Sequence, residues 1–573
     1  MTYILGINSA YHESAACLIE DGKIIAAAEE ERFTRIKHAK PSRVDNADEL
    51  PIQAIDFCLK RAGITLTNVD YVGYSLNPEK RLTKNTQHEH QYSITPDDFG
   101  TVEGEQLFFQ KNKNVEKMMR EQGFRGTFRY IDHHDSHAAS SFFVSGFDDA
   151  AVLVIDGIGE FESTTMYNGR GNRLKKIGSI EFPNSLGFLW EKICKYLGFS
   201  EYDACKVMGL ASYGNAETYR HVFDRFVQLD NDGHFTIDDT ITQFRSHNYS
   251  ALEALFGISK RTEPVKDVAR DTKKYADIAA ALQDVTEDIV IRLARSAKEK
   301  TSSKNLCLAG GVALNCVANG KLLEERVFDE IFIQPAANDA GTALGAALYV
   351  WNQMLNKPRS FVFKSPFLGP AYAETEMQQA LDKSGLKYER YGDIEKTTAK
   401  LLADGKLVAW FQDAMELGPR ALGNRSLLCD PRRKDAVALL NHKVKHREPF
   451  RPFCPSVLAE KASEWFDVEG VPSMSEYMLG AFRVLPSRKE IIPAVVHVDG
   501  TARIQAVEKE TNPKYHALIQ EFEKLTGVPV VLNTSFNDSE PIVCSPEDAI
   551  NTFLKTQIDY LVMGKFLVSR GAP

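Results

Sequence analysis

Residues 3–29 read YILGINSAYHESAACLIEDGKIIAAAE, and their pattern gives the first indication of the fold class. Its apolar runs Tyr3–Asn8, Ala15–Glu20 and Lys23–Glu29 are separated by small or polar residues, which is typical of strands joined by turns. A second stretch repeats this plan, because the apolar run Ala151–Ile155 leads into a polar turn and then into a further strand-like segment from Ser163. Two such hairpins in one chain predict a duplicated lobe.

Strands and helices also alternate around the two hairpins. Between them we expect a helix near Ile52–Ala62 and strands at Val69–Ser75 and Thr127–Ile131. After the second hairpin, five apolar residues at helical spacing predict an amphipathic helix: Ile278, Leu282, Val285, Ile289 and Leu293. Strands at 305–308 and 330–334 are each followed by a turn and a helix. This order predicts an α/β layered fold with parallel pairing in part.

The alternation stops at residues 356–370, where three prolines interrupt a segment with little periodicity. We interpret this segment as a linker between two domains. The predicted N-terminal domain spans 1–355, with lobes of about 1–148 and 149–355. The predicted C-terminal domain spans 371–573 and has its own α+β pattern.

Composition excludes several classes of function. The chain has 573 residues and a formal net charge of -9, which argues against a nucleic-acid-binding protein. Its nine cysteines are scattered without a CxxC pair, as expected for reduced thiols. No apolar run approaches the length of a membrane span, and the N-terminus does not read as a signal peptide. We therefore expect a cytoplasmic enzyme without a membrane or nucleic-acid partner.

A histidine-rich segment follows the strand predicted at 127–131. His133 and His137 are four positions apart, so on a helix they lie on one face about one turn apart. Asp156 and Asp339 each follow a buried strand, where α/β folds collect ligands. Two imidazoles and two carboxylates predict a divalent metal site suited to Fe(II), Mn(II) or Zn(II). Capping histidines and turn aspartates are the alternative, because HxxxH is common by chance.

Two tight turns after strands contain paired glycines. Backbone N–H groups in such turns can approach phosphates, although neither turn matches a P-loop or a dinucleotide fingerprint. Structural turns are therefore an equally good explanation for each turn alone. The candidate nucleotide-binding glycines are Gly157, Gly159, Gly310 and Gly311.

Cations concentrate in two segments of the C-terminal part, GPRALGNRSLL (418–428) and NHKVKHREPFRPFCPSV (441–457). Because a desolvated guanidinium needs a partner, this setting of Gly, Pro and Phe predicts a partly buried anion site for a phosphate. The cations are Arg420, Arg425, Lys443, Lys445, Arg447 and Arg451. Ion pairs with nearby acids are the alternative, which we prefer for Arg432, Arg433 and Lys434. Further on, Val498–Arg503 and Asn533–Asn537 could hold a small anionic, amide-like molecule.

Taken together, the chain resembles the O-carbamoyltransferase family of antibiotic tailoring and nodulation-factor enzymes, typified by the tobramycin, cephamycin and novobiocin carbamoyltransferases. The matching segments run in order along nearly the whole chain. They are HESAACLIEDGKIIAAAEEERFTR, HHDSHAASSFF, VIDGIGE, SLGFLWEKICKYLGF, KVMGLASYG, LAGGVALNCVANGK, PAANDAGTALGAAL, ELGPRALGNRSLL, KHREPFRPFCPSV, HVDGTARIQAV and LNTSFN.

The resemblance implies α/β and α+β architecture, with a two-lobed ASKHA (actin-like) N-terminal domain and a YrdC-like α/β C-terminal domain. It implies that carbamoyl phosphate and ATP, the latter with Mg(II), give carbamoyladenylate in the C-terminal domain. The carbamoyl group then passes to a hydroxyl of a small acceptor at the metal of the N-terminal domain. Fe(II) is the preferred metal, with Mn(II), Zn(II) or Mg(II) as alternatives. The oligomeric state is left open, with a homodimer among the options.

The resemblance also assigns residues. His133, His137, Asp156 and Asp339 match the family's metal positions, and Asn315 joins the nucleotide-binding glycines. The predicted carbamoyl phosphate and adenylate-binding residues are Arg420, Lys445, Arg451, Arg503 and Ser535, of which Lys445 and Arg451 are also catalytic. His12 is the candidate base, with a capping role in its turn as the alternative.

Other functions fit less well. A tRNA threonylcarbamoyl transferase uses related lobes, but the fused C-terminal domain and the acidic net charge favour a small acceptor. A sugar-type kinase would need an Asp-x-Gly-x-Thr pattern in the first turn, where this chain has Asn8 and His12. A non-catalytic nucleotide-binding sensor would have no use for the arginine cluster. The identity of the acceptor stays open.

Overall fold

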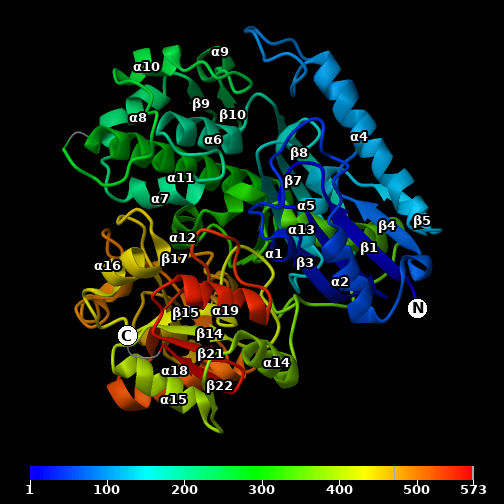
Figure 1. The fold of residues 1–573 in the computed structure, drawn as a ribbon. Coiled ribbons are helices and arrows are strands. Elements are labelled where there is room, and N and C mark those ends of the chain that lie inside the picture. The colour runs from blue at the N-terminus through cyan, green and yellow to red at the C-terminus, as the bar shows by residue number, and fades with distance from the viewer. Residues whose placement is uncertain (271, 470–471, 571–573) are drawn as a thin grey trace. The chain divides into compact units, whose positions relative to one another are not determined.

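The computed structural model describes residues 1–270, 272–469 and 472–570 (Figure 1). The chain forms two compact units. Unit 1 comprises Met1–Thr34 and His38–Phe363, and unit 2 comprises Arg35–Lys37 and Lys364–Pro573. Within the described residues, no helix is both long enough and apolar enough to span a membrane.

The first sheet of unit 1 contains the hairpin predicted from residues 3–29. Its strand order is β3-β2-β1-β4-β5, in which β1 pairs antiparallel with β2 and parallel with β4. The five strands are β1 (Tyr3–Asn8), β2 (Ala15–Glu20), β3 (Lys23–Glu29), β4 (Tyr71–Tyr74) and β5 (Thr127–Tyr130). The first three strands have the predicted bounds, and β4 and β5 are shorter than predicted.

The second sheet of unit 1 repeats this topology. Its order is β8-β7-β6-β11-β12, with β6 antiparallel to β7 and parallel to β11. The strands are β6 (Asp149–Ile155), β7 (Glu162–Arg170), β8 (Arg173–Glu181), β11 (Asn305–Ala309) and β12 (Glu330–Ile333). The duplicated lobe is therefore confirmed, in line with the actin-like pair of sheets that the resemblance implied. Strand β8 was not predicted, because its polar and basic residues lack a clear apolar run.

Two small-residue helices fill the centre of unit 1. Helix α13 (Ala340–Leu348) packs on β1 and β2, helix α5 (His133–Phe142) packs on β6 and β11, and the two helices contact each other. Their backbones approach closely because glycine stands at the contact points. A Cβ on Gly345 would lie 1.7 Å from the Ser136 carbonyl oxygen, and one on Gly6 would lie 1.8 Å from that of Ala343. This packing joins the two sheets and brings the starts of α5 and α13 together.

Further helices complete unit 1. The predicted amphipathic helix is confirmed as α11 (Lys273–Thr301), whose five predicted apolar residues are all buried. The other helices are α1 (Glu31–Thr34), α2 (Ile52–Ala62), α3 (Pro78–Thr86), α4 (Val102–Glu121), α6 (Leu186–Tyr196), α7 (Ala204–Ala211), α8 (Glu217–Phe223), α9 (Asp239–Thr242), α10 (Ser250–Phe256) and α12 (Cys316–Glu324). A small two-stranded sheet consists of β9 (Val227–Leu229) and β10 (Phe235–Ile237).

Unit 2 is built on one mixed sheet with the order β13-β22-β21-β14-β15-β20-β16-β19. These strands are β13 (Tyr388–Arg390), β14 (Val408–Phe411), β15 (Arg425–Cys429), β16 (Cys454–Leu458), β19 (Gln505–Val507), β20 (Val530–Ser535), β21 (Tyr560–Met563) and β22 (Phe566–Ser569). A separate pair consists of β17 (Ala481–Arg483) and β18 (Thr501–Arg503). The helices are α14 (Glu374–Ser384), α15 (Ile394–Ala403), α16 (Ala436–Leu440), α17 (Ser473–Glu476), α18 (Pro513–Thr526) and α19 (Pro546–Lys555). The mixed α/β class is confirmed, and the YrdC-like topology stays a prediction.

Candidate functional site

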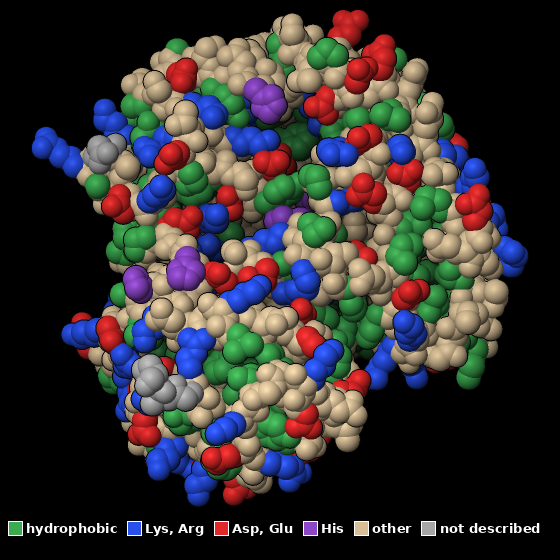
Figure 2. Space-filling view, viewed as in Figure 1, with side chains coloured by type: hydrophobic (Ala, Val, Ile, Leu, Met, Phe, Trp, Pro, Cys, Tyr) green, Lys and Arg blue, Asp and Glu red, His purple; other side chains and the backbone are tan. Residues whose placement is uncertain are grey.

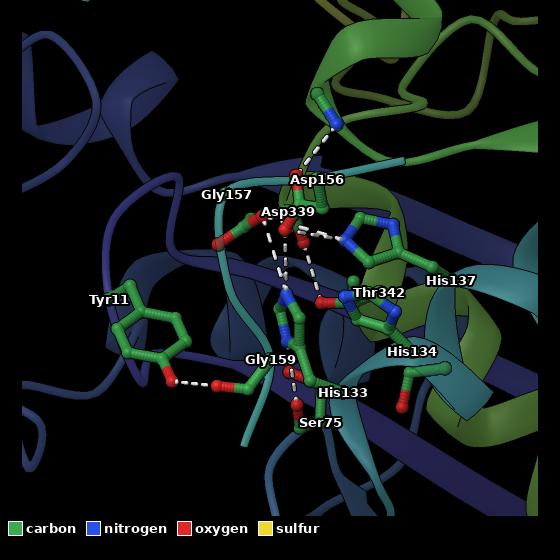
Figure 3. A network of polar contacts seen from close by, with 12 residues as sticks. Tyr11, Ser75, His133, His134, His137, Asp156, Gly157, Gly159, Asp339 and Thr342 are labelled. Atoms are coloured by element: carbon green, nitrogen blue, oxygen red, sulfur yellow. Dashed lines mark hydrogen bonds and ion pairs between the residues drawn. The ribbon is translucent and has the colours of Figure 1, made fainter. Parts of the chain in front are cut away.

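Four predicted metal ligands meet at the centre of unit 1. His133 and His137 lie one turn apart on α5, Asp156 follows β6, and Asp339 precedes α13 (Figure 3). All four are buried, and one ligand atom from each lies within 4.8 Å of the others. The imidazole rings of His133 and His137 stand perpendicular, with centroids 4.7 Å apart. The duplicated fold therefore brings together residues that are more than 200 positions apart in the sequence.

The spacing of these atoms fits a shared metal ion. Nε2 of His133 lies 3.5 Å from both Asp156 Oδ2 and Asp339 Oδ1, and Nε2 of His137 lies 3.7 and 3.6 Å from the same atoms. These separations exceed the usual hydrogen-bond range. They suit ligands that are each about 2.0–2.2 Å from one ion. Both Nε2 atoms are buried and have no hydrogen-bond partner within the described residues. The cluster can hold a metal ion.

Charge compensates within the cluster. Burial disfavours the imidazolium of His133, but the charge of Asp339 and the contacts with Asp156 raise its pKa above the ordinary value. Burial likewise opposes ionisation of Asp339, but His133 and His12 hold the pKa of that carboxyl well below its usual range. A bound cation would take over this role and would require neutral imidazoles.

Neighbouring groups orient the ligands. Nδ1 of His133 lies 3.0 Å from the Ser75 carbonyl oxygen, which can only accept a hydrogen bond. The proton of the neutral ring therefore sits on Nδ1, and Nε2 presents its lone pair to the cluster. The Gly311 amide donates to Oδ1 of Asp156 at 2.8 Å. Asp339 is the N-cap residue of α13 but makes no capping hydrogen bond with its side chain.

Glu160 supports the first histidine and was not singled out in the sequence. Its buried carboxylate accepts from the backbone N–H of His133 at 2.9 Å and from that of Asn77 at 2.8 Å. Burial and the charge of Asp132 raise the pKa of Glu160 to about 7. The signal was available, because Glu160 ends the matched segment VIDGIGE. His134 lies outside the cluster, with its Nδ1 3.0 Å from Thr165 Oγ1.

The candidate nucleotide-binding turns flank the cluster. The N–H of Gly159 donates to the Glu162 carbonyl at 2.8 Å, and the Gly311 amide is occupied by Asp156. Gly310 has a φ of +91°, and a Cβ there would lie 2.2 Å from the Ile155 carbonyl oxygen, so the turn requires glycine. Asn315 caps α12 by accepting from the Ala318 amide at 3.0 Å. The amides of Gly159 and Gly311 and the side chain of Asn315 therefore make hydrogen bonds within the protein itself.

His12 lies in the turn between β1 and β2. The side chain of Asn8 donates to the carbonyl of His12 at 3.0 Å, and the imidazole meets the Tyr202 ring edge-on at 5.4 Å between centroids. Its Nδ1 is buried without a hydrogen-bond partner among the described residues. His12 also contributes to the lowered pKa of Asp339, which indicates that it lies near the cluster.

In unit 2, Lys445 and Ser535 are brought together. The buried Nζ of Lys445 donates to the carbonyls of Ser535 and Asn537 at 2.6 and 2.9 Å. It also donates to the side-chain oxygens of the same residues at 3.2 and 2.7 Å. Burial, then the charges of Arg447, Arg451 and Lys37, hold the pKa of Lys445 well below its usual range. An anion would relieve this repulsion.

The other predicted anion-binding residues of unit 2 lie outside its eight-stranded sheet, Arg420 and Arg451 in loops and Arg503 at the end of β18. The Arg451 side chain is about one quarter exposed, with Nη1 3.7 Å from Glu448. Arg503 donates to the sulfur of Cys454 at 2.9 and 3.1 Å, and Cys454 pairs with Asn533 across β16 and β20. The Asn533 side chain donates to the carbonyl of Ala421, the residue that follows Arg420.

Arg425 corrects the prediction for the arginine cluster. It is fully buried and donates to the carbonyls of Gln412, Asn424, Pro370 and Asp413. Its guanidinium stacks over the Phe411 ring at 3.8 Å. Arg425 therefore holds the loop before β15 in place instead of binding an external anion. The preferred ion pairing of Arg432 is confirmed, because it contacts Asp430 at 2.6 Å.

Comparisons with known proteins cover the whole chain. A family model described as Carbamoyltransferase N-terminus matches residues 3–348, and one described as Carbamoyltransferase C-terminus matches residues 399–570. An uncharacterized protein of Synechocystis is 40% identical over 100% of this chain and 97% of its own length. Nodulation protein NolNO of Sinorhizobium fredii is 39% identical over 98% of this chain and 80% of its own length.

Solved structures match more distantly. Component A of the (R)-2-hydroxyglutaryl-CoA dehydratase of Acidaminococcus fermentans is 16% identical, with a TM-score of 0.33, over 62% of this chain and 100% of that chain. A full-length HypF in a phosphate- and nucleotide-bound form is 12% identical, with a TM-score of 0.33, over 62% of this chain and 56% of that chain. Neither likeness is close enough to support an inference.

Proposed function

The chain belongs to the carbamoyltransferase family, and from this premise we propose that it is an ATP-dependent O-carbamoyltransferase for a hydroxylated natural product. In the C-terminal domain, residues 371–573, water cleaves carbamoyl phosphate to carbamate and phosphate, and the carbamate attacks the α-phosphate of ATP to give carbamoyladenylate and pyrophosphate. In the N-terminal domain, residues 1–355, an acceptor hydroxyl attacks the carbamoyl carbon, and AMP leaves. Activation divides one difficult acyl transfer into two easier steps.

The observation that carries this proposal is the buried cluster of His133, His137, Asp156 and Asp339. Its four ligand atoms converge, and its two Nε2 atoms have no hydrogen-bond partner within the described residues. A divalent cation held there, with Fe(II) preferred, would orient the adenylate phosphate and offset the charge on departing AMP. The turns beside the metal cluster are proposed to shape the nucleotide site. Their residues are Gly157, Gly159, Gly310, Gly311 and Asn315.

His12 is proposed to take the proton of the acceptor hydroxyl. An imidazole titrates near neutral pH and is the most common general base in enzymes. Its buried Nδ1 is not used by any hydrogen bond in the described residues. Its contribution to the lowered pKa of Asp339 supports a position near the proposed leaving group.

Lys445 supports the proposed activation site in the C-terminal domain. Its ammonium is held by neutral oxygens of Ser535 and Asn537, with further cations nearby. Such a site is suited to an anion, because the added negative charge offsets a buried positive one. We propose that Lys445 and Arg451 act on carbamoyl phosphate, and that Arg420, Arg503 and Ser535 hold it and the adenylate.

Purified protein with Mg(II), ATP and carbamoyl phosphate tests the activation step. We expect pyrophosphate and carbamoyladenylate, detected by phosphorus NMR and mass spectrometry, with no pyrophosphate when carbamoyl phosphate is omitted. Formation of ADP instead of AMP derivatives would contradict the proposal, because it would indicate kinase chemistry. A screen of hydroxylated metabolites for a carbamoyl mass increase then identifies the acceptor.

A further inference from the structure

An arginine in unit 1 has its charged end inside an aromatic cluster. The guanidinium carbon of Arg245 lies 5.0, 5.3 and 5.5 Å from the ring centroids of Phe188, Phe182 and Phe99. Phe182 belongs to a small apolar core with Ile158 and Phe161, on which Phe188 also packs. The rings surround the cation with π faces but offer it no hydrogen-bond acceptor.

One edge of this guanidinium is unused. Nε and Nη2 of Arg245 are buried, and neither has a hydrogen-bond partner within the described residues. These two nitrogens form the same side of the guanidinium fork. That side can donate two parallel hydrogen bonds to a carboxylate, sulfonate or phosphate. The residue as a whole is partly exposed, although these two nitrogens are buried.

Of the acids near Arg245, Glu105 and Asp239 are bound to other groups, whereas burial raises the pKa of Glu191 to about 7. Glu105 pairs with Arg81 at 2.8 Å. Asp239 accepts from Tyr92 at 2.7 Å, and its other oxygen accepts from Thr242 and from the backbone of Phe244 at 2.9 Å. Burial, followed by the charge of Arg81, lowers the pKa of Arg245. A buried guanidinium in this position is costly without an oxyanion that accepts its hydrogen bonds.

His90 adds a neutral hydrogen-bonding group to the same cluster. Its ring lies 5.9 Å from that of Phe182, and its Nδ1 is buried without a partner in the described part of the chain. Burial, then the charges of His88 and Arg245, lower the pKa of His90 to about 4. At neutral pH this imidazole is therefore uncharged, and Arg245 supplies the positive charge.

The aromatic cluster adjoins the proposed transfer site. A Cβ on Gly157 would lie 3.5 Å from the Phe188 ring, and Gly157 directly follows the metal-site residue Asp156. Figure 2 shows a hollow with hydrophobic side chains at its bottom in the upper part of the view, where Figure 1 places β8 beside the α9–β10 region. A ligand on the Phe188 ring would thus span from Arg245 towards the cluster.

We propose that Arg245 selects an acceptor that carries an oxyanion together with the hydroxyl to be modified. The oxyanion takes two hydrogen bonds from Nε and Nη2, and the apolar body of the acceptor lies on Phe182 and Phe188. This inference rests on the proposed function and adds the class of acceptor to it. Arg245 binds the oxyanion of the acceptor and does not touch the reacting hydroxyl. It is therefore a specificity residue.

Matched probes test the charge requirement. Three probes are titrated into the wild-type protein and their binding is measured by calorimetry. They are para-hydroxymethylbenzoate, para-hydroxymethylbenzenesulfonate and the neutral methyl ester of the benzoate. We expect both anions to bind at least about tenfold more tightly than the ester, as for hydrogen bonds to a charged group. A preference for one anion alone would distinguish planar carboxylate from tetrahedral sulfonate recognition. Equal binding of all three probes would overturn the proposal.

Two substitutions and a control separate recognition from structure. Arg245→Met should remove the preference for anions while keeping the melting temperature of the unliganded protein equal or higher, because an unpaired buried charge is replaced by an apolar chain of similar length. Arg245→Lys should retain part of the preference. Arg295→Met, at an exposed arginine paired with Glu325, should change neither quantity. A large loss of stability in Arg245→Met with unchanged probe selectivity would assign the arginine to packing alone.

The activation assay distinguishes failure of this inference from failure of the proposed function. Carbamoyladenylate formation does not involve Arg245, so all three variants should form it at the wild-type rate. Normal carbamoyladenylate formation with no selectivity for anions would reject the acceptor class alone. Absence of carbamoyladenylate in the wild type would reject the proposed function, whatever the probes do.

Discussion

The metal cluster of unit 1 and the Lys445 site of unit 2 bury charge in opposite ways. In the cluster, two imidazoles face two carboxylates, so charges compensate, but the Nε2 atoms of His133 and His137 have no hydrogen-bond partner within the described residues. At Lys445, four oxygens accept from the ammonium, so hydrogen bonding is complete, but every one of these oxygens is neutral. The first site lacks hydrogen-bond partners for its ring nitrogens, and the second has no carboxylate among the oxygens that bind its ammonium group.

The two deficits indicate which kind of ligand each site would bind. A buried polar atom without a partner and a buried charge without a counter-ion are both costly, so each deficit indicates the ligand that would remove it. The cluster is suited to a cation that is coordinated by lone pairs of all four side chains. The lysine calls for an anion.

Removal of the two imidazoles should have the largest effect. We expect about one divalent ion per chain in the wild type and none in the His133→Ala, His137→Ala double variant, because half of the ligands are lost. Transfer from synthetic carbamoyladenylate should disappear with the metal. Elemental analysis and a transfer assay measure both. His247→Ala, at an exposed histidine, is the control. Unchanged metal content in the double variant would exclude these two ligands.

His12→Asn tests whether the cluster region also supplies the base. Asparagine keeps hydrogen bonding but cannot take a proton, so transfer from synthetic carbamoyladenylate at saturating acceptor should fall roughly 10²–10⁴-fold. Carbamoyladenylate formation should be unchanged, since it is proposed for the other domain. A transfer rate within a few-fold of wild type would limit His12 to a structural role in its turn.

Arg451→Ala tests the division of labour from the other side. Loss of one arginine–phosphate contact should cost about 1.5–3 kcal/mol and slow carbamoyladenylate formation accordingly. Transfer from supplied carbamoyladenylate should survive. Arg433→Ala is the matched control, because that arginine pairs with Asp435 at 2.6 Å. If folded Arg451→Ala protein also failed with the supplied adenylate, the two steps would not be separable between domains.

Lys192 provides a control for the proposed anion site at Lys445. It is also buried and held by neutral oxygens, the carbonyls of Gln243, Ser246 and Asn248. Carbamoyl phosphate at about 100 times its Kd should stabilise the wild type by about 2.7 kcal/mol, a rise in melting temperature of a few degrees. Lys445→Met should abolish this rise, whereas Lys192→Met should retain it. A rise that persists in Lys445→Met would show that the anion binds elsewhere.

The pH dependence of stability should show the smallest effect. Burial lowers the pKa of Lys192 to about 8 from an ordinary value of 10.5. The folded state therefore binds fewer protons than the unfolded state between these values, and stability should increase as pH rises from about 8 to about 10.5. Below pH 8 the penalty is present in full. Thermal melts across this range should show a weaker increase in Lys192→Met, and an equal increase would assign the effect to other groups.

Several features were predictable because they depend on local pattern. Strands β1, β2 and β3 were predicted to the residue, since apolar runs and turn residues determine them. The buried face of α11 followed from its periodicity. Strand β8 was missed because two of its residues are lysines and it has no clear apolar run. Its extended conformation is stabilised by antiparallel pairing with β7, which its own sequence does not reveal.

Arginines mark the limit of such reasoning. Arg425 stands among small residues and Arg451 among prolines and phenylalanines, contexts that both suggested an anion site, yet only the structure shows Arg425 bound to four backbone carbonyls. Arg245 carried no signal at all, since its partners Phe99, Phe182 and Phe188 come from distant segments. The fold determines which acids lie close to an arginine. The sequence does not reveal which of those acids are already bound to other groups.

By itself, the sequence determined the mixed α/β class, the duplicated hairpins, the family and the residue types of the candidate site, because each depends on short-range periodicity or on ordered motifs. Only the tertiary structure decided that His133 and His137 meet Asp156 and Asp339. That convergence requires two sheets joined through α5 and α13, whose backbones touch at Gly345. Ligand distances, burial and the partners of each charge depend on this close packing between segments that are far apart along the chain.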